Sequence, residues 1–167
     1  MKIERVFRHD MTPAEAFAMS ITPGYQEKKC RDAGALHWEV DVRVKDDDTA
    51  VVKAKRKMPT VGFPSLLRKV VPSGLMSTET VSWGPAAADG SRVARLHVDF
   101  HGAPARMNGE FRLSSDANGG STVVIDADFS VIVPILGRKA EQLAAPIIFN
   151  VIESEERTAV EWMAGIR

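Results

Sequence analysis

The stretch Val131-Ile132-Val133-Pro134-Ile135-Leu136-Gly137 marks the point where the chain changes from strands to a helix. Before it, most of the sequence consists of short segments that alternate apolar and polar residues, as half-buried strands do. After it, apolar residues recur at spacings of three, four and seven almost to Arg167, which predicts one long amphipathic helix. We expect a many-stranded sheet to wrap around this helix and to enclose a cavity.

The terminal helix has a predicted apolar face and a proline in its middle. Pro146 removes one backbone hydrogen bond and predicts a kink. The stripe expected to face the sheet consists of Leu136, Ala140, Leu143, Ile147, Val151 and Trp162, with Glu153, Glu156 and Arg157 on the solvent side.

Two short helices are predicted between the first and second strands. Thr12-Pro13-Ala14-Glu15 combines an N-cap, a proline at the first helical position and an acid three residues after the cap. It predicts a helix over 13–20. Thr22-Pro23 repeats the start signal, so a second helix should extend to Asp32, before Gly34.

Charge complementarity predicts how the strands pair. Pairing Val44 with Ala50 across the turn at 46–48 brings Asp41 opposite Lys53 and Glu39 opposite Lys55. A second hairpin, around Gly102-Ala103, sets Asp99 beside Arg106 and Arg95 beside Glu110. A third, through a turn at 116–120, is predicted to set Asn108 opposite Asp126, Arg106 beside Asp128, Gly109 opposite Ile125 and Ala105 opposite Phe129. A further strand is predicted over 75–83, after a long connection from Pro59 to Gly74 with a helical turn at 65–70.

Composition limits the class of protein. The chain has 167 residues, a mass of 18.3 kDa, and 22 basic against 22 acidic residues, which argues against a nucleic-acid binder because such proteins carry a dominant basic face. Cys30 is the single cysteine, which excludes an internal disulfide framework and a multi-cysteine metal site. We expect no secretory leader at Met1, because residues 2–7 have the pattern of a strand, and the sequence has no apolar run of about 20 residues. We expect one cytoplasmic domain over 1–167.

Four short motifs resemble the START/SRPBCC superfamily, and most closely a bacterial domain family of unknown function within it. They are Pro64-Ser65-Leu66-Leu67-Arg68-Lys69, Trp83 after a strand, Gly102-Ala103-Pro104, and Val133-Pro134-Ile135-Leu136-Gly137-Arg138-Lys139-Ala140-Glu141. The resemblance implies an α+β helix-grip fold, in which a seven-stranded antiparallel curved sheet wraps around a long C-terminal helix. Its members include lipid carriers, hydrophobic-ligand binders, polyketide cyclases and co-chaperones, so the fold leaves function open.

The inward side chains predict a ligand-binding cavity for an apolar molecule. The alternative is a filled core, which any half-buried sheet would provide. The predicted lining consists of Trp38, Val40, Val52, Arg56, Glu79, Trp83, Leu96, Phe100, Met107, Phe111, Leu143, Ile147 and Val151.

Arg56 is the unusual member of this set, because a guanidinium on the inner face could clamp a ligand carboxylate or phosphate. The alternatives are an ion pair with Glu79 or a side chain that reaches out to solvent at the strand end. The segment Phe63–Val71 mixes apolar residues with Arg68 and Lys69, as a lip that touches a membrane surface would. Its alternative is a short helix that packs over the cavity mouth.

Other polar residues form no catalytic group. His97, Asp99 and His101 share a strand face, and so do Asp126 and Asp128, but both sets should face solvent. Basic neighbours could lower the thiol pKa of Cys30. No histidine adjoins it, so a structural cysteine is expected. His9 and His37 stand alone. We expect no metal and no cofactor.

Three functions fit these patterns. The leading hypothesis is a carrier or sensor that binds a small hydrophobic or amphipathic ligand, as a monomer or weak homodimer. The second is an enzyme of the polyketide-cyclase or dehydratase kind, with Arg56 and Glu79 as its only inward titratable pair. The third is a protein-interaction module.

Overall fold

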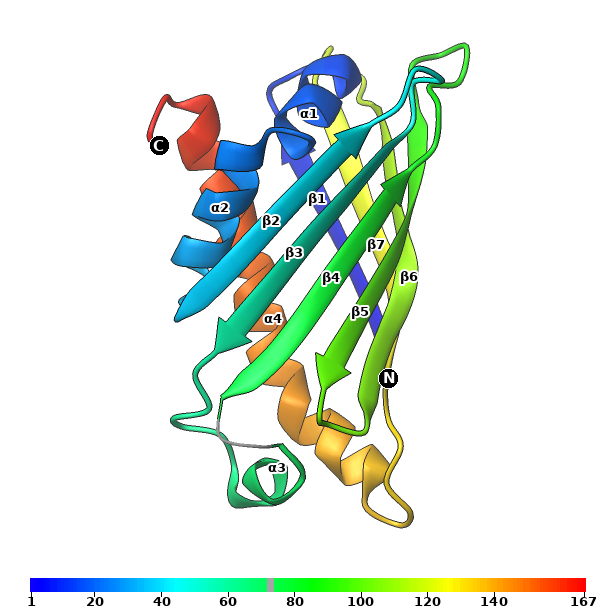
Figure 1. Ribbon diagram of the computed structural model, residues 1–167. Helices are drawn as coiled ribbons and strands as arrows, with labels where there is room; N and C mark the ends of the chain where they lie inside the picture. Colours follow the sequence, from blue (N-terminus) through cyan, green and yellow to red (C-terminus); the bar gives the residue numbers. More distant parts are fainter. Residues whose placement is uncertain (72–73) are drawn as a thin grey trace.

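The computed structural model describes residues 1–71 and 74–167, and Figure 1 shows a curved sheet wrapped around one long helix. The strands are β1 (Lys2–His9), β2 (His37–Val44), β3 (Ala50–Met58), β4 (Leu75–Trp83), β5 (Arg92–His101), β6 (Ala105–Ser115) and β7 (Ser121–Val131). The helices are α1 (Pro13–Ser20), α2 (Pro23–Asp32), α3 (Ser65–Val70) and α4 (Gly137–Met163). The predicted order of elements is confirmed. Part of the predicted connection from Pro59 to Gly74, residues 72 and 73, lies outside the described residues.

All seven strands belong to one antiparallel sheet in the order β1-β7-β6-β5-β4-β3-β2. The strands β1 and β2 therefore lie at opposite edges, and α1 and α2 connect them. Figure 1 shows α1 and α2 at one end of the molecule and α3 at the other, while α4 runs between these ends across the sheet. Among the described residues, no helix is long and apolar enough to span a membrane.

The start of α1 follows its sequence signal. The Thr12 hydroxyl accepts a hydrogen bond from the Glu15 amide at 3.3 Å, and the Glu15 carboxylate accepts one from the Thr12 amide at 2.8 Å. This reciprocal cap satisfies donors that the first turn of a helix would otherwise leave free.

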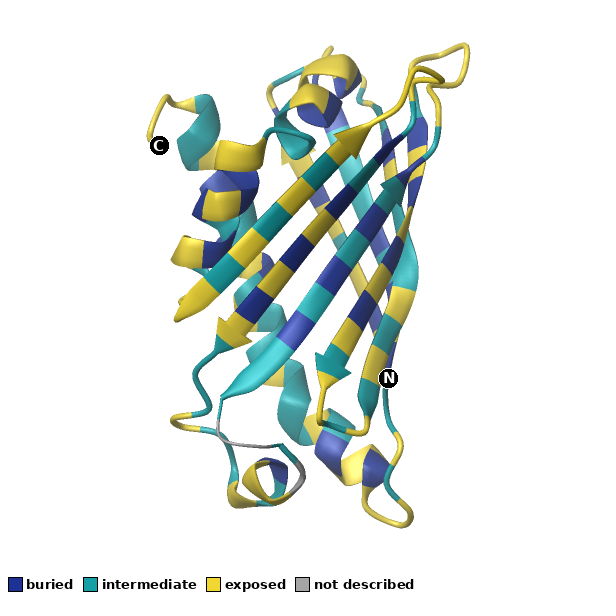
Figure 2. Cartoon of the chain, viewed as in Figure 1, coloured by how far each residue is buried: buried dark blue, intermediate teal, exposed yellow. Residues whose placement is uncertain are grey.

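Two of the three predicted strand registers are confirmed. Val44 pairs with Ala50, which brings Asp41 opposite Lys53 and Glu39 opposite Lys55. Across the next predicted hairpin, Asp99 lies opposite Arg106, and Arg95 lies opposite Glu110. Figure 2 shows the resulting alternation of buried and exposed residues along the strands.

The predicted register between β6 and β7 is wrong by two residues. Asn108 lies opposite Asp128 and Arg106 opposite Ser130, while on the inner face Gly109 lies opposite Ala127 and Ala105 opposite Val131. The turn itself lies at 116–120 as predicted, where the Asp116 amide donates to the Gly120 carbonyl at 2.9 Å and the Asp116 carboxylate accepts from the amides of Asn118 and Gly120. A turn closed in this way places Ser115 opposite Ser121, which fixes the observed register; the register predicted from charge matching did not agree with this turn.

Gly109 leaves room for a close approach of the two strands. A Cβ added at this position would lie 2.3 Å from the Asp126 carbonyl oxygen and 2.5 Å from the Ala127 Cβ. Only glycine fits there, because any side chain would collide with β7.

The predicted face of α4 is partly wrong. Leu136 precedes the helix and is exposed, and Trp162 packs edge-on against Tyr25 of α2. The C-terminal half of α4 instead buries Ser154 and Thr158, whose hydroxyls donate hydrogen bonds to Asp32 of α2 at 3.0 and 2.9 Å. A second packing partner, α2, therefore turns polar positions of α4 inward.

Candidate functional site

Three neighbouring cavities lie in a row between the sheet and α4. The one beside α1 and α2, here the α2 chamber, has a volume of about 100 Å³. The middle chamber has about 150 Å³, and the α3 chamber beside α3 has about 80 Å³. Phe111 and Ile125 line both the α2 and middle chambers, and Phe63 and Phe100 line both the middle and α3 chambers.

The middle chamber is lined mainly by apolar side chains. The sheet contributes Leu96, Val98, Phe100 and Met107, and α4 contributes Ile147, Ile148, Val151 and Ile152. An apolar cavity of about 150 Å³ stays dry and holds a benzene ring in an engineered protein. The middle chamber is therefore large enough for an aromatic ring or a length of alkyl chain.

Most of the predicted site residues line this row. Eight line the middle chamber: Arg56, Glu79, Leu96, Phe100, Met107, Phe111, Ile147 and Val151. Val52 and Trp83 line the α2 chamber. Trp38, Val40 and Leu143 line none of the three. Trp38 and Val40 belong to the edge strand β2, which contacts α2. Leu143 does not reach the chambers, because α4 turns Ala144, Ile147 and Ile148 toward them instead.

Two buried charged side chains, Arg56 and Glu79, line the middle chamber, and two partly buried ones, Lys29 and Glu155, connect them to the α2 chamber. The Arg56 guanidinium donates to Glu79 at 2.6 Å and to Glu155 at 3.0 Å. The Lys29 ammonium lies 3.0 Å from Glu155 and 3.5 Å from Glu79. The structure thus forms the ion pair that was the alternative for Arg56. Sequence reasoning missed Lys29 and Glu155, because α2 and α4 bring them in from distant parts of the chain.

The network keeps Glu79 and Lys29 charged. Burial alone would raise the pKa of Glu79, but the charges of Lys29 and Arg56 outweigh it and hold this pKa below its usual value. Burial alone would lower the pKa of Lys29, but the carboxylates of Glu155 and Glu79 raise it. Two cations and two anions therefore compensate one another, and the network carries no net charge.

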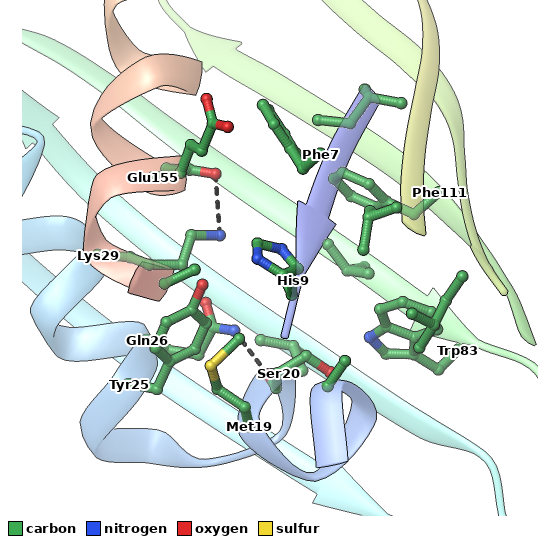
Figure 3. A pocket seen from close by; sticks show the side chains of 18 residues that line it. Phe7, His9, Met19, Ser20, Tyr25, Gln26, Lys29, Trp83, Phe111 and Glu155 are labelled. Atoms are coloured by element: carbon green, nitrogen blue, oxygen red, sulfur yellow. Dashed lines mark hydrogen bonds and ion pairs between the residues drawn. The ribbon is translucent and has the colours of Figure 1, made fainter. Parts of the chain in front are cut away.

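The α2 chamber has a second set of polar groups, which Figure 3 shows around His9. His9 is 94% buried, since its exposed fraction is 6%. Its Nδ1 has no hydrogen-bond partner among the described residues. The Gln26 amide donates to the Ser20 carbonyl at 2.6 Å. The polar lining consists of His9, Ser20, Tyr25, Gln26, Lys29, Glu155 and Glu156.

His9 was treated as a solitary residue from the sequence, and Glu156 was predicted to face solvent. Both line the α2 chamber, so the prediction for Glu156 is wrong. A signal for His9 was present, because Ile3, Phe7 and His9 share the inward positions of β1. Glu156 lines the chamber because the C-terminal half of α4 is rotated toward α2.

The segment predicted to touch a membrane, Phe63–Val71, lies at the other end of the row. Phe63, Leu67 and Val71 line the α3 chamber together with Ala144 and Ile148 of α4. Leu67 is buried, whereas Arg68 and Lys69 are exposed. The segment therefore covers the cavity mouth, as its alternative interpretation stated, and presents two cations to solvent.

The remaining polar residues considered from sequence do not join the chambers. His97 is half-exposed and lies 2.5 Å from Asn108 and 3.1 Å from Asp99, which confirms a solvated face. Cys30 is buried, and burial raises the pKa of its thiol, so its basic neighbours do not activate it.

Comparisons with known proteins agree on the fold. A family model described as "Protein of unknown function (DUF2505)" matches residues 6–163, and no curated protein matches the sequence. The ZhuI aromatase/cyclase from Streptomyces sp. R1128 superimposes with a TM-score of 0.58 at 12% identity, covering 96% of this chain and 94% of that chain. Human STARD10 superimposes with a TM-score of 0.57 at 12% identity, covering 98% of this chain and 64% of that chain.

A third solved structure is the lipid transfer and protein localization domain of human StarD13. It gives a TM-score of 0.53 at 10% identity, covering 94% of this chain and 72% of that chain. Identities this low are informative about the fold alone. The predicted helix-grip fold is confirmed by these superpositions, and the family model confirms the predicted likeness to a domain family of unknown function.

Proposed function

We propose that this chain, which belongs to the DUF2505 family of proteins of unknown function, binds a small hydrophobic or amphipathic molecule between the sheet and α4. The observation that carries the proposal is the middle chamber, whose volume of about 150 Å³ side chains leave unfilled. It shares lining residues with the chamber on either side, so a ligand that extends along the row would be elongated.

The apolar lining would supply most of the affinity. Burying one methylene group is worth about 0.8 kcal/mol, which corresponds to roughly fourfold in the dissociation constant. Affinity for straight-chain compounds should therefore rise by about this factor per methylene until the row is full. Two structural neighbours, an aromatase/cyclase and a lipid transfer domain, support a ligand of low polarity.

The charged network favours binding over acid–base chemistry. Arg56 and Glu79, the pair that a cyclase-like or dehydratase-like mechanism would use, donate and accept a hydrogen bond with each other at 2.6 Å. Arg56 is a poor proton donor in any case, because its guanidinium keeps its proton in proteins. We therefore assign the chain a carrier or sensor role.

The α3 end of the molecule is suited to contact with a membrane surface during loading. Residues 59–71 and 131–140 contain no acidic residue, yet contribute the exposed cations Arg68, Lys69, Arg138 and Lys139. Figure 1 places α3 and the segment before α4 at this same end. Ile135 is fully exposed there, and Val61 is 94% exposed. Exposed aliphatic side chains among cations are typical of surfaces that bind anionic lipids.

A chain-length series tests the binding proposal. Straight-chain alcohols of six to twelve carbons would be titrated into the protein by isothermal calorimetry, with native mass spectrometry of the freshly purified protein to detect a retained ligand. We expect saturable one-site binding and an affinity that rises by roughly fourfold per methylene before it levels off. The absence of saturable binding at every chain length would refute the proposal.

A further inference from the structure

His9 is a buried polar group in the cavity row that the proposed function leaves without a role. It lines the α2 chamber, is 6% exposed, and its Nδ1 has no partner among the described residues. In Figure 3 its ring lies in the middle of the side chains that line the chamber, between Lys29 on one side and Trp83 on the other. Buried polar groups in native proteins are nearly always hydrogen-bonded, so we expect a bound molecule to supply the hydrogen-bond partner of this histidine.

The neighbouring charges are already compensated or negative. The Lys29 ammonium is held by Glu155 and Glu79, so it offers no free cation to a ligand. Glu156 contributes a further carboxylate to the lining, and its negative charge acts to raise the pKa of His9. A ligand carboxylate or phosphate placed there would meet two carboxylates, Glu155 and Glu156, and find no uncommitted cation among the described lining residues.

His9 and Tyr25 supply neutral hydrogen-bonding groups. Burial lowers the pKa of His9, against the opposing effect of Glu156, so the imidazole is uncharged at neutral pH and has one donor and one acceptor nitrogen. Burial raises the pKa of Tyr25 to about 12, so its hydroxyl keeps its proton and can donate. Both side chains line the same chamber.

We propose that the α2 chamber holds the uncharged polar end of the ligand, a hydroxyl or a carbonyl group, with His9 and Tyr25 as its hydrogen-bond partners. The apolar remainder then lies in the middle chamber, which shares Phe111 and Ile125 with the α2 chamber. This inference rests on the proposed function and adds to it the orientation of the ligand and the class of its polar group.

The test compares four compounds that share one ten-carbon chain and differ only at its end: 1-decanol, decanoate, decylamine and decane. Their affinities would be measured at pH 7.5 for the wild type, for His9→Phe and for His37→Phe. His37 is an exposed histidine on β2 that lines none of the three chambers, and it is the matched control.

We expect the wild type to bind 1-decanol about tenfold more tightly than decanoate, because the decanoate carboxylate would meet Glu155 and Glu156. His9→Phe should weaken 1-decanol by about tenfold and leave decane within about twofold, because decane makes no hydrogen bond. His37→Phe should change neither. His9→Gln, which keeps a donor and an acceptor, should retain most of the preference.

The outcomes separate the two proposals. If none of the four compounds binds, the proposed function fails. If decane and 1-decanol bind but His9→Phe affects 1-decanol no more than His37→Phe does, the assignment of His9 is wrong. Tighter binding of decanoate or decylamine than of 1-decanol would overturn the class of polar group. If His9→Phe does not fold, Tyr25→Phe and His9→Gln are decisive, and a 1-decanol affinity unchanged in Tyr25→Phe would remove Tyr25 from the site.

Discussion

Arg56 on β3 donates a hydrogen bond to Glu155 on α4 at 3.0 Å, although 99 residues separate them in sequence. Glu79 on β4 and Lys29 on α2 complete the same buried network. Two strands and two helices are therefore joined by charges that compensate one another beside an apolar cavity.

Breaking this network on one side should be costly. In Arg56→Met, Glu79 keeps only the Lys29 ammonium at 3.5 Å, so we expect the free energy of unfolding to fall by about 3–5 kcal/mol, the usual penalty for an uncompensated buried charge. The double variant Arg56→Met/Glu79→Met leaves Lys29 paired with Glu155 and should recover most of this loss. Urea unfolding measures both. A double variant no more stable than the single one would show that charge compensation is not the cause.

His9 should make stability depend on pH. Burial lowers its pKa below 6.5, so the folded protein binds this proton less readily than the unfolded chain. Its full contribution to stability is therefore present above pH 6.5 and is lost as the pH falls through the lowered pKa. Between pH 7.5 and 5 we expect a steeper loss in urea-measured stability for the wild type and His37→Gln than for His9→Gln. The stability that the lowered pKa of Glu79 contributes is present above its ordinary pKa of 4.5 and is lost only at lower pH, outside this window. Equal slopes would contradict the assignment.

Ile135 combines full exposure with a backbone φ of 66°. β-Branched residues rarely adopt this left-handed conformation, which costs about 1–2 kcal/mol. Ile135→Gly should therefore increase stability by up to about 1 kcal/mol, since greater freedom of the unfolded chain offsets part of the gain. If the α3 end contacts lipid, the same change should weaken cosedimentation with phosphatidylglycerol-containing vesicles. Val160→Asn, an exposed position on α4, should leave it unchanged. Unaltered sedimentation of Ile135→Gly would argue against the membrane contact.

Filling the middle chamber should separate stability from binding. Val98 is buried and lines this chamber, and Val98→Phe adds volume in its direction. If the space is unfilled, the variant should keep or raise the midpoint of thermal unfolding while its affinity for 1-decanol drops about tenfold or more. In a core already packed solid, the added ring would cost about 1–3 kcal/mol of stability. A destabilised variant with unchanged affinity would contradict the account.

Local signals in the sequence predicted most of the fold. The cap at Thr12 and the charge pairs around Asp41 and Asp99 act between neighbouring segments, so one sequence is sufficient to interpret them. The β6–β7 register was wrong although the turn at 116–120 forms as predicted, because the strands were aligned by charge matching and Arg106 lies opposite Ser130, not Asp128.

The candidate site was only partly predictable. Apolar lining residues such as Leu96 and Phe100 follow strand alternation, and Arg56 was recognisable as a charge on an inner face. Lys29 and Glu155 could not be assigned, because their roles depend on how α2 and α4 pack together. The only sequence signal for His9 was weak: it is a polar residue at the end of a strand whose alternate residues face inward.

The most direct test is an intermolecular NOE experiment on the methyl-labelled protein with bound 1-decanol. The account predicts contacts from the alkyl chain to methyl groups of Val98, Ile148 and Ile152, which face one another across the middle chamber from β5 and α4. Contacts confined to exposed methyl groups such as those of Val160 and Ile166, with none to these three residues, would show that the space between sheet and helix is not the binding site.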